Sequence, residues 1–226
     1  MARIEGTISE IFETGEGTGL GIRVQNPVNF QPGQYFQGMS TVPGEVLPLT
    51  LYPFQITGQV LFVMPSRAST WWVGQEIRLR GALGNGFHLP AAAERIGLVN
   101  YGKGKALGLL SLAEALLSTG KEVALVTNAP LQGLPMALEI LAADQAKEVA
   151  DWSDAMAFSA VTEEIADLIG RFGWLGLRKS VEVLIQTEMP CGGSAACGVC
   201  AIQTKKGWRY ICKDGPVFPL AELAAG

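Results

Sequence analysis

Residues 189–218 read MPCGGSAACGVCAIQTKKGWRYICKDGPVF and hold every cysteine of the chain. Residues 1–190 contain no cysteine, although the chain is 226 residues long. The four thiols follow the spacing C-x5-C-x2-C-x11-C, and three glycines lie inside the loop. Residues 201–204 and 208–212 read as short strands around the turn Lys205-Lys206-Gly207. Such a hairpin would return the fourth cysteine to the first three.

This cysteine spacing predicts a [2Fe–2S] cluster with the ligands Cys191, Cys197, Cys200 and Cys212. Iron–sulfur clusters are held by thiolates, and plant-type proteins use C-x4-C-x2-C with a distant fourth cysteine. The first gap is one residue longer here, which a bulged loop could absorb or which could alter the ligand set. A structural zinc site accepts the same thiolates, but zinc ribbons usually pair two C-x2-C units and this chain has one. Free thiols or two disulfides are the remaining interpretations, and disulfides are rare in the cytoplasm.

The composition describes a globular chain, with 48% apolar and 17% charged residues. A net charge of −4 without any basic run argues against a nucleic-acid partner. No apolar stretch approaches the ~20 residues that a membrane span needs. The start, MARIEG, lacks the pattern of a signal peptide. We therefore expect a soluble, cytoplasmic protein.

Upstream of the cysteines, residues 1–93 are expected to form an antiparallel β-barrel. Short segments of alternating or continuous apolar residues are separated by Gly and Pro turns, as is typical of strands in small barrels. The expected strands include residues 4–11, 20–24, 34–36, 59–63 and 76–80.

The pattern changes near Glu94, where strands begin to alternate with helices. The expected strands are residues 96–99, 122–127, 154–158 and 181–186. The expected helices are residues 105–118, 134–143 and 162–169, the last with Thr162 as its N-cap. This alternation predicts a parallel α/β sheet. We expect a barrel domain of the flavin-binding type over 1–93, an α/β domain of the nucleotide-binding type over 94–186 and a cluster arm over 187–226.

Four segments together resemble one family: MPCG at 189–192, CGVC at 197–200, CKDGPVF at 212–218, and GALGNGF at 81–87, which is similar to that family's GPLGNGF. The family is the electron-transfer subunit of B-type dihydroorotate dehydrogenase, a ferredoxin-reductase-like iron–sulfur flavoprotein, and this chain resembles a diverged member. The resemblance implies that NADH reduces a bound FAD, that FAD passes single electrons to the [2Fe–2S] cluster, and that the cluster feeds a partner catalytic subunit in pyrimidine biosynthesis. It therefore also implies a hetero-oligomer.

The resemblance implies a flavin site on the barrel, from which this sequence departs. The implied residues are Tyr35, Leu47, Pro48, Leu49, Thr50, Tyr52, Ser69, Thr70, Gly84, Asn85 and Gly86. The family's Arg-Pro-x-Ser reads Leu47-Pro48-Leu49-Thr50, so the arginine that would hold the pyrophosphate is missing. Thr50 can replace the serine hydroxyl, and Tyr52 could stack on the flavin ring. Residues 66–70 could form the phosphate-binding turn at a helix start, where Arg67 either supplies the lost charge or is a solvated residue.

The implied NAD(P)H site departs further, so we regard dinucleotide binding as doubtful. Residues 100–105 read NYGKGK, and a Gly-x-Gly alone is weak support for such a site. Phe158-Ser159-Ala160-Val161 stands where the family carries Cys-Gly-Pro. Lys103 and Lys105 could meet an anion, although such lysines are usually solvated. Glu163 and Glu164 suit the first turn of a helix, where carboxylates favour the helix dipole.

Two hypotheses follow from these departures. In the first, the chain is an electron-transfer subunit that carries electrons between a flavin and the cluster. In the second, it is a non-catalytic, cluster-bearing structural or wire subunit that has lost flavin and NAD(P)H binding. A third hypothesis is a zinc-stabilised interaction domain, which analysis of the bound metal would distinguish from the other two.

Overall fold

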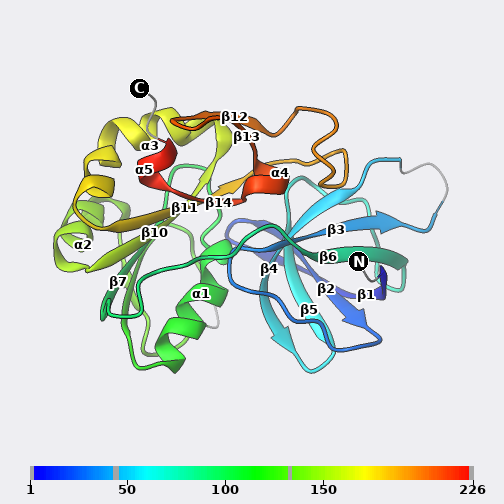
Figure 1. Ribbon diagram of the computed structural model, residues 1–226. Coiled ribbons are helices and arrows are strands. Elements are labelled where there is room, and N and C mark those ends of the chain that lie inside the picture. The colour runs from blue at the N-terminus through cyan, green and yellow to red at the C-terminus, as the bar shows by residue number, and fades with distance from the viewer. Residues whose placement is uncertain (1–2, 43–45, 132–133, 224–226) are drawn as a thin grey trace.

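The computed structural model describes residues 3–42, 46–131 and 134–223, and its two halves, a β-barrel and an α/β sheet, lie side by side (Figure 1). The ferredoxin-reductase-like arrangement expected from the sequence is therefore confirmed. Within the described ranges, no helix is both long and apolar enough to cross a membrane.

The barrel is a closed sheet of antiparallel strands in the order β1-β2-β5-β4-β3-β6. Its strands are β1 (Arg3–Thr14), β2 (Gly17–Val24), β3 (Tyr35–Ser40), β4 (Leu49–Thr57), β5 (Val60–Pro65) and β6 (Glu76–Leu83). Alternate side chains fill its interior, and Ile8, Ile22 and Leu79 are almost completely buried there. The side chains between them point outward, so the outer face of β3 and β4 is available to other parts of the chain.

The second half is a six-stranded sheet in the order β14-β11-β10-β7-β8-β9. Its strands are β7 (Arg95–Asn100), β8 (Glu122–Val126), β9 (Glu139–Leu141), β10 (Ala155–Val161), β11 (Ser180–Gln186) and β14 (Val217–Pro219). All of them pair in parallel except β14, which pairs antiparallel with β11. The chain runs outward from β7 to β9 on one side and returns to β10 on the other. The switch point therefore lies between β7 and β10, where open α/β sheets receive ligands at the carboxyl ends of their strands.

The helices of this half are α1 (Leu107–Ser118), α2 (Ala146–Trp152) and α3 (Ile165–Phe172), with short 3-10 turns η1 (Ala143–Gln145), η2 (Thr162–Glu164) and η3 (Gly173–Leu177). The helix predicted for residues 134–143 is wrong. Pro135 lacks an amide hydrogen, and residues 139–141 instead pair with β8 as the edge strand β9. The helix α2 was missed by the sequence pattern.

The predicted N-cap at Thr162 is also wrong. Thr162 begins the 3-10 turn η2, which has no side-chain cap, and its buried hydroxyl has no partner within the described chain. The helix that follows is α3.

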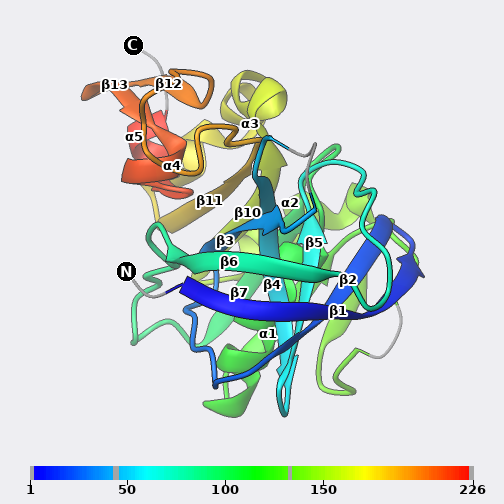
Figure 2. The ribbon, with the colours of Figure 1, turned by 90° about the vertical axis from the view of Figure 1, so that its right-hand side faces the viewer.

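The cysteine-bearing segment contains β12 (Ala201–Thr204), β13 (Gly207–Tyr210), α4 (Ile211–Asp214) and α5 (Leu220–Leu223). The predicted hairpin is present, but Thr204 pairs with Gly207, so the turn has two residues rather than three. The second strand ends at Tyr210, because Cys212 lies on the short helix α4. Figure 2 shows this segment extending above the sheet and the barrel.

Candidate metal centre

The four cysteines come from the loop before β12 and from the helix α4. Cys191 is half-buried and Cys197 is exposed, whereas Cys200 and Cys212 are buried. All four are free thiols, so the disulfide interpretation does not describe this structure.

The thiols are arranged as two pairs. The Cys191 thiol interacts with that of Cys197, and the Cys200 thiol interacts with that of Cys212. Among the described residues, no three ligand-type side chains gather around a single ion position. A structural zinc ion needs four ligands around one point, whereas each iron of a [2Fe–2S] cluster takes two cysteine thiolates. Four thiolates suit either metal, and the charge of Cys191 also acts on Cys212, so the two pairs lie near each other as the two ends of a two-iron cluster require.

Backbone amides in the loop point at the Cys191 sulfur. Burial raises the pKa of Cys191, but hydrogen bonds from the Ser194 hydroxyl, the Cys197 thiol and the amides of Ala196 and Ser194 outweigh it and lower that pKa to about 6. Gly192 has a positive φ, as do the neighbouring Gly193 and Ala195. Such left-handed turns bring successive N–H groups together into the concave nests that hold anions and iron–sulfur clusters.

The second pair has the opposite electrostatic balance. Burial, followed by the hydrogen bond and the negative charge of Cys200, raises the pKa of Cys212 to about 12, while the Ala195 amide opposes this. Two buried thiolates repel each other unless a cation lies between them. Bound metal reverses this balance, because coordination stabilises the thiolate form.

The barrel fixes the cysteine loop from outside. The Tyr35 hydroxyl, on β3, donates to the backbone oxygen of Cys212 at 2.7 Å. The Arg80 guanidinium, on β6, donates to the backbone oxygen of Gly192 at 3.0 Å. A Cβ atom at Gly193 would lie 2.6 Å from the Tyr35 hydroxyl, so only glycine allows this approach.

The GALGNGF segment braces the other end of the cysteine arm. The Asn85 side chain donates to the Val217 oxygen at 2.8 Å and accepts from the Val217 amide at 3.1 Å. Its backbone amide donates to the Gly215 oxygen at 2.8 Å. Gly84 has a φ of +73°, and a Cβ there would lie 2.4 Å from the Gly215 oxygen. Gly84 and Asn85 thus position the arm, and a contact of theirs with a flavin stays a prediction.

Thr50, predicted to contact the flavin through its hydroxyl, and Tyr52, predicted to stack on the flavin ring, are already bonded to the segment that leads into the cysteine loop. The Met189 amide donates to the Thr50 hydroxyl at 3.1 Å. The Tyr52 hydroxyl donates to the Thr187 oxygen at 3.0 Å and accepts from the Thr187 amide at 2.8 Å. Both side chains are almost completely buried. A flavin that contacts either hydroxyl therefore requires residues 187–189 to move.

The predicted phosphate-binding turn at residues 66–70 is not followed by a helix. The Ser69 hydroxyl accepts from the Trp71 amide at 3.2 Å, and the Arg67 guanidinium lies 3.8 Å from the Glu188 carboxylate. The Ser66 hydroxyl, in contrast, is buried without a partner in the described part of the chain. This orphaned hydroxyl is the feature of the turn that fits a further ligand.

Five further predicted flavin residues are placed by the structure, but their contacts with a flavin are not tested. Leu47 and Thr70 are exposed, and Leu49 is buried in the barrel core. Pro48 lines a cavity of about 490 Å³ beside Cys191, in which Arg3, Arg78 and Arg80 also take part. Gly86 packs against the backbone oxygen of Pro32. Their contacts with a flavin remain predictions.

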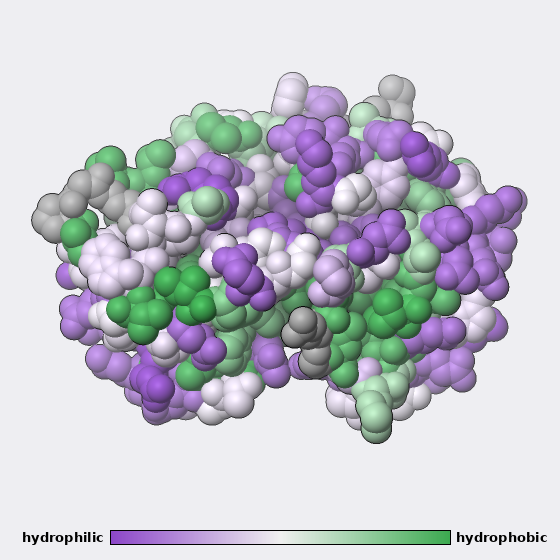
Figure 3. Space-filling view, turned by 180° about the vertical axis from the view of Figure 1, so that it is seen from behind, coloured by the Kyte–Doolittle hydropathy of each residue, from purple (hydrophilic) through white to green (hydrophobic). Residues whose placement is uncertain are grey.

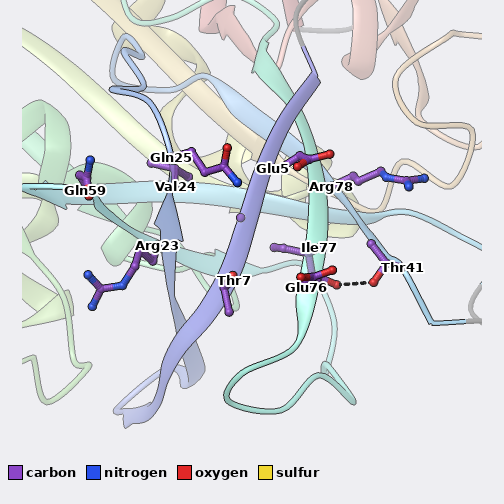
Figure 4. Close-up of a pocket in the computed structure, with 11 residues that line it drawn as sticks. Glu5, Thr7, Arg23, Val24, Gln25, Thr41, Gln59, Glu76, Ile77 and Arg78 are labelled. Carbon is purple, nitrogen blue, oxygen red and sulfur yellow. Dashed lines mark hydrogen bonds between the residues drawn. The ribbon is translucent and has the colours of Figure 1, made fainter.

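Two of the cavities that involve no cysteine lie on or beside the barrel. One, of about 280 Å³, lies on the barrel, and Figure 4 shows that its charged side chains, such as Arg23 and Glu76, spread along the strands instead of converging. The other, of about 500 Å³, lies between the barrel and α1 and is lined by Phe12, Phe54 and Phe62. Seen from behind, apolar residues flank the indentation between the two halves (Figure 3).

Comparison with known proteins agrees with the cysteine arrangement. Residues 186–224 match the family described as the iron–sulfur cluster binding domain of dihydroorotate dehydrogenase B. The chain is 26% identical to the dihydroorotate dehydrogenase B (NAD(+)) electron transfer subunit of Clostridium perfringens, over 96% of each chain. It is also 26% identical to a putative subunit of the same kind from Thermotoga maritima, over 99% of each chain.

The solved structures show the same fold. The NADH-dependent reduced ferredoxin-NADP oxidoreductase is similar with a TM-score of 0.74 at 16% identity, over 96% of this chain and 89% of that one. The ferredoxin reductase of carbazole 1,9a-dioxygenase has a TM-score of 0.57 at 15% identity, over 77% of this chain and 64% of that one. The fold and the cysteine arm thus define a ferredoxin-reductase-like protein with a C-terminal iron–sulfur domain. Within that class, the chain is a diverged relative of the electron transfer subunits of dihydroorotate dehydrogenase B.

Proposed function

We propose that this chain is an electron-transfer subunit that carries electrons through a [2Fe–2S] cluster to a partner oxidoreductase subunit of the dihydroorotate dehydrogenase type. The observation that carries this proposal is the arrangement of Cys191, Cys197, Cys200 and Cys212 as two thiol pairs in a loop braced by the barrel. The match of this segment to the iron–sulfur domain family supports it. A bound cluster supplies the one-electron carrier, and the chain's own residues hold and orient it.

The proposal assigns different tasks to the two thiol pairs. Cys200 and Cys212 are buried against the sheet and the barrel, so they anchor the cluster. Cys197 is exposed, and its neighbour Val199 is 62% exposed, so this edge of the loop is the part that a partner can approach. We place the partner subunit on this edge. The barrel, the α/β half and the cluster arm together form one subunit of a hetero-oligomer in the cytoplasm. Four free thiols are compatible with that reducing compartment.

The proposal has two forms, which differ in whether this chain binds a flavin. In the first form, a flavin bound on the barrel exchanges electrons with the cluster. Two observations favour this form: the similarity to reductases that use a flavin, and the buried Ser66 hydroxyl, which has no partner among the described residues. In the second, the chain is a cluster-bearing wire subunit without a flavin of its own. The bonds from residues 187–189 to Thr50 and Tyr52 favour this second form, because they occupy the Thr50 hydroxyl and hold the Tyr52 ring, which was predicted to stack on the flavin, in a buried position.

One purification tests both forms. Iron, sulfide, zinc and flavin are quantified on the same anaerobically purified sample. Two irons and two sulfides per chain support the proposal. One flavin per chain on the same sample then selects the first form, and no flavin selects the second. Zinc in place of iron overturns both.

A further inference from the structure

The loop after β7 occupies the place where sheets of this class receive a phosphate group. It follows the strand next to the switch point and leads into the N-terminus of α1, which spans Leu107–Ser118. The unpaired N–H groups of a helix N-terminus bind anions, because they carry a partial positive charge. The partners of these N–H groups therefore decide whether a dinucleotide phosphate can bind.

A carboxylate from the barrel already binds the start of α1. Glu16 accepts the Ala106 amide at 2.6 Å through one oxygen and the Leu107 amide at 2.9 Å through the other. The Asn100 side chain donates to the first of these oxygens at 3.2 Å. Glu16 thus makes the bidentate contact with successive backbone amides that a phosphate oxygen pair would make.

A second carboxylate and an amide bind the loop before the helix. Both Glu164 oxygens accept the Lys103 amide at 2.9 Å. The Gln186 side-chain oxygen accepts the Lys105 amide at 2.8 Å. The Lys105 ammonium donates to the Pro65 oxygen at 3.1 Å and also interacts electrostatically with the Glu16 carboxylate.

Three other amides in this region donate to backbone oxygens. Tyr101 donates to the Ser159 oxygen, Gly104 to the Tyr101 oxygen and Gly108 to the Lys105 oxygen. The loop is also pressed against β10, since a Cβ atom at Gly104 would lie 2.2 Å from the Ser159 oxygen. A phosphate that binds the Lys103, Ala106 and Leu107 amides would therefore have to displace carboxylates of its own sign.

Glu16 is held in this position by a tight hairpin turn. Thr14 pairs with Gly17, so Gly15 and Glu16 form the two-residue tip between β1 and β2. A Cβ atom at Gly15 would lie 2.5 Å from the Pro130 ring, so the tip is packed against the segment that follows β8. The Glu16 amide also donates to the Thr14 hydroxyl at 3.1 Å. The packed hairpin tip thus positions the Glu16 carboxylate at the contact between the barrel and the α/β half.

We propose that Glu16 and Glu164 are internal anions that occupy the phosphate-binding positions of residues 103–107, so that the chain rejects dinucleotides at this loop. The inference concerns dinucleotide binding at this loop and leaves the electron donor open to the flavin measurement above. The inference goes beyond the proposed function, and it does not depend on which form of that function holds.

The test titrates the purified, cluster-loaded protein with ADP-ribose, which carries the phosphates of a dinucleotide without its redox group. The wild-type chain is expected to show no saturable binding up to ~1 mM, the range of very weak affinities. The double variant Glu16→Ala/Glu164→Ala is expected to bind at least about tenfold tighter than that limit, because it frees backbone donors and removes two negative charges. The matched control Glu13→Ala/Glu163→Ala removes exposed carboxylates from the same hairpin and the same turn, and it should behave as wild type.

Hydrogen exchange provides a readout that needs no ligand and that survives if the double variant fails to fold. The amides of Ala106 and Leu107 should exchange faster in Glu16→Gln than in wild type, and should be unchanged in Glu13→Gln. Saturable ADP-ribose binding to the wild type, no gain in the folded double variant, or unchanged exchange in Glu16→Gln would each overturn the inference. Iron and sulfide content, measured on the same samples, reports separately on the proposed function.

Discussion

The cysteine loop and the loop after β7 are both places where backbone N–H groups converge, but only the first leaves them for a ligand. In the cysteine loop, the amides of Ser194, Ala195 and Ala196 point at thiol sulfurs. In the loop after β7, the corresponding donors are taken by Glu16 and Glu164. The same backbone chemistry thus surrounds cysteine sulfurs in one region and internal carboxylates in the other. The difference lies in the side chains that each loop receives.

Among the changes that test this comparison, the removal of a cysteine ligand should have the largest effect, measured as loss of the bound cluster. Cys200→Ser is expected to abolish the visible spectrum of the cluster, because a buried ligand is lost and the sequence has no fifth cysteine to replace it. Absorbance together with iron content measures this. Val199→Ala, which changes an exposed neighbour, should keep full colour. A Cys200→Ser protein with full colour and iron would remove Cys200 from the ligand set.

Breaking the brace at Asn85 should have the next largest effect. Asn85→Ala removes both side-chain bonds to Val217, so the free energy of unfolding should fall by about 1–3 kcal/mol. Urea unfolding measures the change, and iron retained after dialysis shows whether the arm has loosened. Asn26→Ala, at an exposed turn after β2, is the control and should lie near wild type. Equal stability of both variants would show that the GALGNGF segment does not brace the arm.

Tyr35→Phe tests a single contact between the barrel and the cysteine arm. It removes the hydroxyl that donates to the Cys212 oxygen, at a cost of about 1 kcal/mol in the free energy of unfolding. The ring stays in place, so packing is preserved. Urea unfolding of Tyr35→Phe beside wild type measures this, and a change near zero would mean that the barrel does not hold α4 through this bond.

The smallest effect is expected where a carboxylate binds backbone amides at an exposed site. Asp154 accepts the amides of Glu94 and Arg95 and also pairs with the Arg95 guanidinium at 2.8 Å. The Arg95 side chain, followed by these amides, holds the pKa of Asp154 well below its usual range. Because the folded pKa is depressed, the stabilisation is present above the unfolded pKa, ~3.9, and is lost as the pH falls through the folded value.

Asp154→Asn should therefore lower Tm slightly at pH 7, and the difference from wild type should shrink as the pH falls below ~4. Thermal unfolding across this range measures it, with Asp151→Asn on the exposed face of α2 as the control. A difference that stays constant with pH would show that the Asp154 charge is not the cause.

The cysteine site was predictable because its information is local. Three ligands lie within ten residues, and a short hairpin leads to the fourth, so spacing alone indicated the cluster. The barrel and the parallel sheet were predictable from strand periodicity for the same reason. The error at residues 134–143 arose because pairing with β8, a tertiary interaction, decides the structure of β9.

The carboxylate contacts of the loop after β7 were not predictable, because the residues that make them are distant in the sequence. Glu16 lies 90 residues from Ala106, and nothing in the hairpin sequence indicates which N–H groups it binds. Glu164 was interpreted as a helix-dipole residue, but it binds Lys103 across 61 residues. Asn85 was assigned to the flavin by resemblance, whereas the structure shows the bonds by which it holds the arm.

The pairing of β14 with β11 has a consequence for solubility and for the evolution of the chain. β14 comes from beyond the last cysteine and covers the outer edge of β11, whose Val183, Leu184 and Ile185 are buried. An uncovered apolar edge strand is a template for aggregation. A chain shortened before residue 187 would lose its redox arm and expose this edge at the same time. The arm therefore also covers this edge, so its loss would destabilise the sheet as well as remove the cysteines.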